Sequence, residues 1–245
     1  MHVSVELVPD IAKLESQLRF LRTQCPQVGA INIPDLPRFS FRSWSACEVV
    51  YPQFPYCIPH LRAIDCSAGE ALLFKEVVSR LRFPAVLVVS GDPPTSMRET
   101  VHATSIFDLL LRIREELPQV KIYAALDQYR QSISSEIAYV ERKLVAGFDG
   151  FFTQPFFSLH LLREWQSYMR GSVVYWGLSP VLSERSHGYW AQKNKVRFPY
   201  HFKPTLEWNV GYGRDFLDVA GEDGGNCYIM PIRVQIEEYC SALFA

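Results

Sequence analysis

The first apolar run of the chain carries a carboxylic acid. Glu6 lies within Val-Ser-Val-Glu-Leu-Val, residues 3–8, where its neighbours are mainly aliphatic. A carboxyl group enclosed in such a strand loses solvation, which disfavours its charged form and raises its pKa. A carboxyl that keeps its proton near neutral pH can serve as a general acid. The alternative is a glutamate that pairs with an arginine such as Arg62, or one at an edge that faces water.

Further polar residues stand where other apolar runs end. Asp92 follows Gly91, which permits close approach of the backbone to a ligand, and precedes two prolines that stiffen the loop. A turn that Asp92 forms with its own backbone is the alternative. Gln154 lies between phenylalanines, so its amide needs a backbone partner or a heteroaromatic ligand. His60 has no second histidine at metal-ligand spacing, which favours a core residue. The full set at run ends is Glu6, Asn32, Asp35, His60, Arg62, Asp65, Ser90, Asp92, Asp127, Gln128, Thr153, Gln154, Ser179 and Arg233.

The elements that must position these residues alternate along the whole chain. The short apolar runs predict strands at Val3–Val8, Val28–Ile33, Ile58–Ile64, Ala85–Val89, Val120–Leu126, Gly150–Thr153, Val173–Leu178 and Cys227–Ile232. The stretches between them, with apolar residues at three- and four-residue steps, predict helices. These are Ile11–Thr23, Gly69–Leu81, Ser105–Leu117, Ser134–Ala146, Leu159–Met169, Ser183–Lys193 and Val234–Phe244.

This alternation predicts the fold class α/β, as a single (β/α)8 TIM barrel over residues 1–245. About eight strand–helix units in a chain near the roughly 250 residues of a typical barrel suit that architecture. A doubly wound open sheet is the rival, but it usually has a glycine-rich first turn, and no G-x-G-x-x-G occurs here. In a barrel, the polar residues at the strand ends converge at the carboxyl-end mouth.

Two segments interrupt the alternation and are interpreted as long loops. The first is Pro34–Tyr56, rich in proline, aromatic residues and arginine, and the second is Phe198–Gly225. Connections of this length usually act as lids or binding loops. We therefore expect both to lie over the mouth of the barrel.

Composition and charge exclude several classes of protein. The chain has 245 residues, a net charge of −1, and 48% hydrophobic and 21% charged residues, which is typical of a globular protein. It has no basic block for nucleic acid and no apolar stretch long enough to span a membrane. Six scattered cysteines lack zinc spacing, which predicts reduced thiols and a cytoplasmic protein without a metal. No signal peptide, G-x-S-x-G or phosphate-binding P-loop occurs.

Several segments, in order, resemble the methylenetetrahydrofolate reductase family. The resemblance runs from residue 3 to about residue 235. The specificity of the resemblance comes from the order of the segments. A glutamate lies in the first strand, G-D-x-P follows the fourth and T-Q ends the sixth. The matching segments are V-S-V-E-L-V-P (3–9), P-H-L-R-A-I-D (59–65), V-S-G-D-P-P (89–94), R-K-x-x-A-G (142–147), F-F-T-Q-P-F-F (151–157), G-L-S-P (177–180) and K-V-R-F-P (195–199).

The resemblance implies a barrel that carries a flavin, usually FAD, and passes hydride from NADH or NADPH to methylenetetrahydrofolate. It implies that Glu6 is the general acid that opens the five-membered ring of the folate, and that Asp92 tunes charge near flavin and pterin. Gln154 would bind the pterin, and Arg233 would also contact the substrate. It implies flavin contacts from His60, Ser90, Gly91, Asp92, Tyr129, Glu136, Arg142 and Lys143.

Departures from the family pattern fall mainly where a flavin is held. The stretch Leu126–Ser135 is short and lacks a histidine, Ser90 replaces an arginine, and Glu184 stands where an aromatic residue is usual. FMN, or no flavin at all, is therefore an alternative. A folate-binding or partner-dependent protein without reductase activity, or an enzyme that transfers hydride directly, also stays open. We expect a small-molecule folate partner, no nucleic acid and no membrane; a homo-oligomer is compatible with the sequence.

Overall fold

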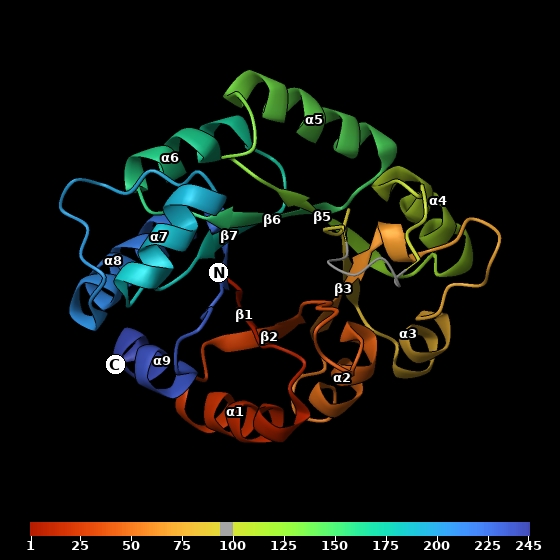
Figure 1. Ribbon diagram of the computed structural model, residues 1–245, viewed down its shortest axis with the longest axis horizontal. Helices are drawn as coiled ribbons and strands as arrows, with labels where there is room; N and C mark the ends of the chain where they lie inside the picture. Colours follow the sequence, from red (N-terminus) through yellow and green to blue (C-terminus); the bar gives the residue numbers. More distant parts are fainter. Residues whose placement is uncertain (94–99) are drawn as a thin grey trace.

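The computed structural model describes residues 1–93 and 100–245 and forms a closed parallel barrel. The eight strands are neighbours in sequence order, and the last pairs with the first (Figure 1). They are β1 (Val3–Glu6), β2 (Val28–Ile33), β3 (Cys57–Arg62), β4 (Ala85–Val89), β5 (Lys121–Leu126), β6 (Gly150–Pro155), β7 (Val174–Leu178) and β8 (Asn226–Ile229). The predicted (β/α)8 fold is confirmed.

Helices surround the barrel on its outer side, as Figure 1 shows. In the described residues they are α1 (Ile11–Gln24), α2 (Ser43–Val50), α3 (Lys75–Leu81), α4 (Ile106–Glu116), α5 (Ile133–Ala146), α6 (Leu159–Tyr168), α7 (Glu184–Lys193), α8 (Leu206–Gly221) and α9 (Ile236–Phe244), with short 3-10 turns at Ala63–Asp65 and Glu222–Gly224. Most bounds match the prediction within two or three residues. The helix expected from Gly69 begins only at Lys75. In the exposed turn before it, the carbonyls of Ser67 and Glu70 accept hydrogen bonds from Arg112 instead of from helical N–H groups.

The prediction of one long loop over 34–56 is wrong, because the segment contains α2. This helix buries Trp44, Cys47 and Val50, which recur at three-residue steps and pack in the outer core. The flanking prolines and aromatic residues hid this short periodic run. Only the part before α2 lies at the mouth.

The prediction of a second long loop over 198–225 is also wrong, because most of it is α8. Glycines inside the helix masked its periodicity, since glycine is a poor helix former. Gly213 is required by packing: a Cβ there would lie 2.8 Å from both Leu243 Cδ1 and Tyr239 Oη. The close contact between α8 and α9 therefore explains why Gly213, a residue type more typical of loops, lies inside a helix.

The strands separate two cores. Val3, Val5 and Leu7 point outward and pack with the helices in one large cluster. The alternate residues point into the barrel, where Phe152 stacks on Tyr175 with ring centroids 4.3 Å apart and meets Tyr228 edge-on at 5.1 Å. Aromatic rings fill this interior, so the barrel is a packed core with its open end at the mouth.

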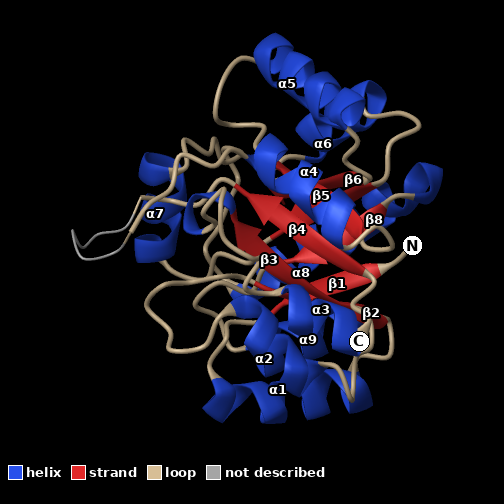
Figure 2. Cartoon of the chain, turned by 90° about the vertical axis from the view of Figure 1, so that its right-hand side faces the viewer, coloured by secondary structure: helices blue, strands red, loops and turns tan. Residues whose placement is uncertain are grey.

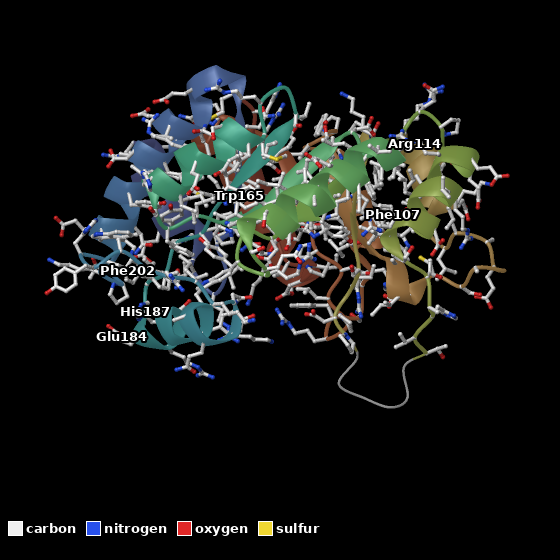
Figure 3. All side chains as sticks on the ribbon, turned by 90° about the horizontal axis from the view of Figure 1, so that it is seen from above. Phe107, Arg114, Trp165, Glu184, His187 and Phe202 are labelled. Carbon is white, nitrogen blue, oxygen red and sulfur yellow. The ribbon has the colours of Figure 1, made fainter. Side chains whose placement is uncertain are left out.

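Helix α7 lies at the carboxyl end of the strands, away from the N-terminus (Figure 2). It is held there by an aromatic cluster in which His187 stacks on Phe202 at 5.1 Å, and Figure 3 shows these two side chains together. Two helices, α7 and α8, therefore follow β7, and α7 lies at the carboxyl end of the barrel. Among the helices of 1–93 and 100–245, none combines the length and the apolar character needed to cross a membrane.

Candidate functional site at the mouth of the barrel

A cavity of about 420 Å³ opens at the mouth on the side of β1, β2 and β8. We call it the mouth cavity. Polar and charged groups line it together with apolar side chains, as is usual for small-molecule sites. Its lining residues are Glu6, Leu7, Val8, Asp10, Lys13, Gln17, Leu36, Arg38, Phe39, Ser186, Tyr189, Pro231, Ile232, Arg233, Val234 and Ile236.

Glu6 ends β1 and presents its carboxyl group to the mouth cavity. The side chain is partly buried, and its carboxylate accepts a hydrogen bond from the hydroxyl of Tyr228 on β8. Burial raises the pKa of Glu6 to about 7, and the hydrogen bond from Tyr228 opposes this rise without cancelling it. A carboxyl with this pKa is protonated in a large fraction of molecules at neutral pH and can donate its proton.

A neutral polar chain lies beside Glu6 inside the barrel. Ser4 donates to the Asn32 side-chain oxygen, and the Asn32 amide lies 3.1 Å from His60 Nε2. Burial lowers the pKa of His60 to about 3, so its ring is neutral at physiological pH and its Nε2 can accept the amide proton. Within the described part of the chain, no group of three or more potential metal ligands gathers.

Cationic side chains stand at the rim of the mouth cavity. Arg233 follows β8, and its backbone φ is 58°. Its guanidinium lies 5.7 Å from the ring centre of Tyr189 on α7. Arg38, from the segment between β2 and α2, is exposed on the cavity lining. Among residues 1–93 and 100–245, no ion pair joins either arginine to an acid. The rim can therefore attract a ligand that carries a carboxylate.

Two predicted strand-end acids, Asp35 and Asp65, serve a structural role. Arg42 Nη2 lies 2.5 Å from an oxygen of Asp35 and 2.6 Å from one of Asp65, and its guanidinium lies 4.6 Å from the ring centre of Trp44. The Asp35 carboxylate also accepts from the Ser43 backbone at 3.2 Å. These contacts fasten the start of α2 to the ends of β2 and β3.

The loop that carries Asp92 is held by a buried arginine. Arg62 on β3 donates to the Asp92 carbonyl at 2.7 Å, and the Asp92 carboxyl group itself is exposed. Ser90 is exposed as well, and its carbonyl accepts from the Ile64 backbone at 3.2 Å. The last proline of the Ser-Gly-Asp-Pro-Pro motif, Pro94, lies outside the described residues. Asp92 is not part of the mouth cavity.

Gly91 is required where it stands. Its φ is 90°, and a Cβ would lie 2.8 Å from Ile64 Cγ1 and 2.9 Å from Arg62 Nε. We expect Gly91→Ala to lower the free energy of unfolding by about 1–3 kcal/mol, from left-handed strain and overpacking. Urea denaturation measures this. Gly29→Ala is the control, because nothing lies within 4 Å of its Cβ position; an equal loss in both variants would contradict the argument.

Gln154 is the penultimate residue of β6 and is not among the residues that line the mouth cavity with Glu6. Its backbone carbonyl accepts from Gln128 Nε2 at 2.9 Å and from Thr153 Oγ1 at 2.9 Å. Tyr129 donates its hydroxyl to the Pro155 carbonyl at 3.0 Å. Gln154 is thus available to a ligand through its partly exposed side chain, while Gln128 and Tyr129 brace the strand end.

Two charged residues of α5, Glu136 and Lys143, lie behind the barrel wall. Glu136 is fully buried and accepts from Arg130 at 2.7 Å and Gln131 at 2.7 Å. Lys143 is 2% exposed and donates to the Ala125 carbonyl at 2.6 Å. Both side chains are therefore engaged between α5 and β5 and do not reach the mouth cavity.

This placement bears on the predicted flavin contacts. Arg142 is exposed on α5 and lies over the rings of Phe107 and Tyr139, 5.5 and 5.8 Å from their centres. Together with the internal contacts of Glu136 and Lys143, this leaves none of the three aimed into the mouth. As placed, these residues do not fit the phosphates of a flavin.

Sequence reasoning overlooked some residues of the site. Tyr228, the partner of Glu6, and the cavity-lining Arg38 and Phe39 were not singled out. A signal for Tyr228 existed: in a barrel strand, alternate residues face inward, so Asn226 and Tyr228 share the interior face. Arg38 and Phe39 lie in the segment 34–56, whose arginine and aromatic content predicted a binding loop over the mouth, but nothing in the sequence distinguished these two residues within it.

Comparison with known proteins supports the fold. No protein-family model matches the sequence, and no curated protein matches it significantly, so the resemblance to a reductase family stays a prediction. Among solved structures, an uncharacterized protein from Clostridium thermocellum that binds two copies of 5-methyl-5,6,7,8-tetrahydrofolic acid has a TM-score of 0.63 at 11% identity, covering 99% of this chain and 94% of the other.

Two enzymes give similar matches. Dihydropteroate synthase from Thermus thermophilus has a TM-score of 0.53 at 15% identity, covering 99% of this chain and 91% of its own. Orotidine 5'-phosphate decarboxylase from Pyrococcus horikoshii has a TM-score of 0.56 at 10% identity, covering 99% and 97%. At these identities the likeness shows the (β/α)8 fold alone.

Proposed function

We propose that this barrel binds a reduced folate in the mouth cavity and reduces 5,10-methylenetetrahydrofolate to 5-methyltetrahydrofolate with NADH or NADPH. The observation that carries the proposal is Glu6, a carboxyl with a pKa of about 7 that opens onto a cavity of about 420 Å³. Support comes from the reductase-like order of motifs. It also comes from the structural neighbour that binds 5-methyltetrahydrofolate.

In the proposed reaction, Glu6 donates its proton to N10 of the folate. The bond between N10 and the bridging carbon breaks, and its electron pair stays on N10. The carbon is then part of an iminium ion with N5. A hydride from the dihydronicotinamide adds to that carbon, giving the N5-methyl group and the oxidised nicotinamide. His60 and Asn32, which lie beside Glu6, are neutral, so neither places a positive charge next to the iminium.

The rim of the mouth cavity suits the other end of such a ligand. Folates end in a glutamate with free carboxylates, and Arg38 and Arg233 present guanidinium groups at the rim. Charge-assisted hydrogen bonds from guanidinium to carboxylate are stronger than neutral ones. No step is assigned to a flavin, because Glu136 and Lys143 of α5, which were expected to contact it, are engaged elsewhere.

Binding by titration calorimetry tests the proposed site. We expect Arg233→Ala to weaken the binding of 5-methyltetrahydrofolate in the mouth cavity about tenfold, the effect of losing one charge-assisted contact worth about 1.5 kcal/mol. Arg170→Ala is the control, because Arg170 is exposed and does not line this cavity. An unchanged affinity of Arg233→Ala would contradict the proposed contact between the rim and the folate.

Turnover and absorption then distinguish the versions of the proposal. Consumption of NADH or NADPH that depends on methylenetetrahydrofolate, by a colourless protein, supports direct hydride transfer. A yellow protein bleached by the dihydronicotinamide and reoxidised by the folate would support a flavoenzyme. Folate binding without turnover by either route would support the second candidate, a folate-binding or partner-dependent protein, which the internally engaged α5 residues favour.

A further inference from the structure

A second, larger cavity lies outside the mouth, between the N-terminal ends of α6 and α8. Its volume is about 760 Å³, within the range of small-molecule sites. We call it the α6–α8 groove. It shares no lining residue with the mouth cavity. Its lining residues are Phe157, Ser158, Leu159, His160, Pro199, His201, Lys203, Thr205, Glu207, Trp208, Gly211, Tyr212 and Asp215.

One face of α8 forms a wall of this groove. Trp208, Gly211, Tyr212 and Asp215 recur at three- and four-residue steps, which places them on the same side of the helix. The rings of Trp208 and Tyr212 stack on each other with centroids 5.1 Å apart and planes within 8°. The Tyr212 hydroxyl donates to the Phe156 carbonyl at 3.0 Å, which fixes the pair. The wall is therefore aromatic and well ordered.

Among residues 1–93 and 100–245, no neighbouring atom requires a glycine at position 211 of this wall. A Cβ at Gly211 would meet nothing within 4 Å, and the helix continues through it with no positive φ recorded there. Glycine inside a helix costs about 1 kcal/mol relative to alanine. By contrast, Gly213 on the same helix is required by the contacts of α9. At 211, the absent side chain leaves open space beside Trp208 and Tyr212.

The polar groups of the groove define the ligand that would fill this space. Glu207 and Asp215 supply carboxylates along α8, and Lys203 supplies a cation from the preceding segment. A carboxylate can accept two hydrogen bonds from adjacent N–H groups of a planar ring, and aromatic rings stack on such a ring. A pterin has an adjacent amino group and ring N–H. A folate carries, in addition, a carboxylate tail for a cation such as Lys203.

We propose that the α6–α8 groove is a second binding site for a reduced folate. The pterin ring lies over the space left by Gly211, against the aromatic wall, and its amino edge faces the carboxylate of Glu207, one helical turn from Gly211. This inference rests on the proposed function for the class of ligand, but it concerns a separate site. The protein then binds two folate molecules, one at the mouth and one in the groove.

Gly211→Leu tests the second site without removing any contact of the chain. The leucine is a better helix former than glycine, so we expect thermal stability to be kept, while its side chain fills the space for the pterin. In titration calorimetry with 5-methyltetrahydrofolate, the native chain should bind two equivalents and Gly211→Leu one. Asp218→Leu, exposed on α8 and outside the groove, should still bind two.

A second variant and the mouth variant separate the possible failures. Glu207→Gln should weaken one of the two binding events at least fivefold and leave the other unchanged. One equivalent that responds to Arg233→Ala but not to Gly211→Leu would overturn the groove and leave the mouth site standing. One equivalent that responds only to Gly211→Leu would support the groove and overturn the mouth site. No binding by the folded native chain would overturn both.

Discussion

Glu6→Gln is expected to reduce the turnover of methylenetetrahydrofolate by about 100- to 10,000-fold, the usual contribution of a positioned general acid. Glutamine has nearly the same shape and can still accept the hydrogen bond from Tyr228, but it has no acidic proton. Binding of 5-methyltetrahydrofolate, which needs no proton transfer, should change little. Steady-state kinetics and titration calorimetry of the same preparation measure the two quantities.

The pH dependence of turnover by the native chain tests the same role of Glu6, because the expected direction of the change is known. The proton of Glu6 is present below its pKa of about 7 and absent above it. Turnover should therefore fall as pH rises through 7, approaching a tenfold loss per unit, and the residual activity of Glu6→Gln should lack this fall. Glu238→Gln, on the first turn of α9, is the control and should keep the native profile. A fall with the same midpoint in Glu6→Gln would assign the titration to another group.

Stability should respond to the same group. The carboxyl of an unfolded glutamate has a pKa near 4.5, whereas burial raises that of Glu6 to about 7. The folded chain thus holds this proton more tightly, so its contribution to stability is full below pH 4.5 and is lost as pH rises through 7. Glu6→Gln removes this loss. The difference in urea midpoint between the two chains should shift in favour of the variant from pH 6 to pH 8.

The sequence indicated the barrel because its evidence is local. Strand runs and helix periods are set by which face of each element is buried, and that pattern is readable residue by residue. The prediction from sequence missed the helices α2 and α8, and there is a physical reason for each. Gly213 is dictated by the approach of α9, which is distant in sequence, and the short helix α2 is masked by neighbouring prolines.

The candidate site was predictable only in part. Glu6 could be found, because a charged residue inside an apolar strand is conspicuous in the sequence. Its raised pKa depends on burial by other strands, and its partner Tyr228 is 222 residues away. Lys143 shows the converse: it matches a motif, yet packing places it behind the barrel wall. A motif identifies a residue type, while tertiary contacts decide which cavity it reaches.

Glu136→Gln is the second variant with a large expected effect, and it addresses that buried position. Lys143 lies with its ammonium group 4.0 Å from the ring centre of Tyr139; burial lowers its pKa to about 8, while the neighbouring Glu136 raises it. Removing the Glu136 charge takes from Lys143 the largest charge that favours its protonated form, and it takes from Arg130 its ion-pair partner. We expect the free energy of unfolding at pH 7 to fall by about 3 kcal/mol.

Two further variants show whether the effect comes from the buried charges. Glu141 is exposed on the same helix, so Glu141→Gln should change the free energy of unfolding by less than about 0.5 kcal/mol. Adding Lys143→Met to Glu136→Gln removes the buried cation as well and should restore at least half of the loss, because apolar replacement of buried charges that interact is often neutral or stabilising. Urea denaturation of the four chains measures these differences. If Glu136→Gln kept full stability but lost binding of a flavin, Glu136 and Lys143 would belong to a cofactor site. A loss of stability in the absence of any flavin would show that these two residues stabilise the packing of α5 on the barrel.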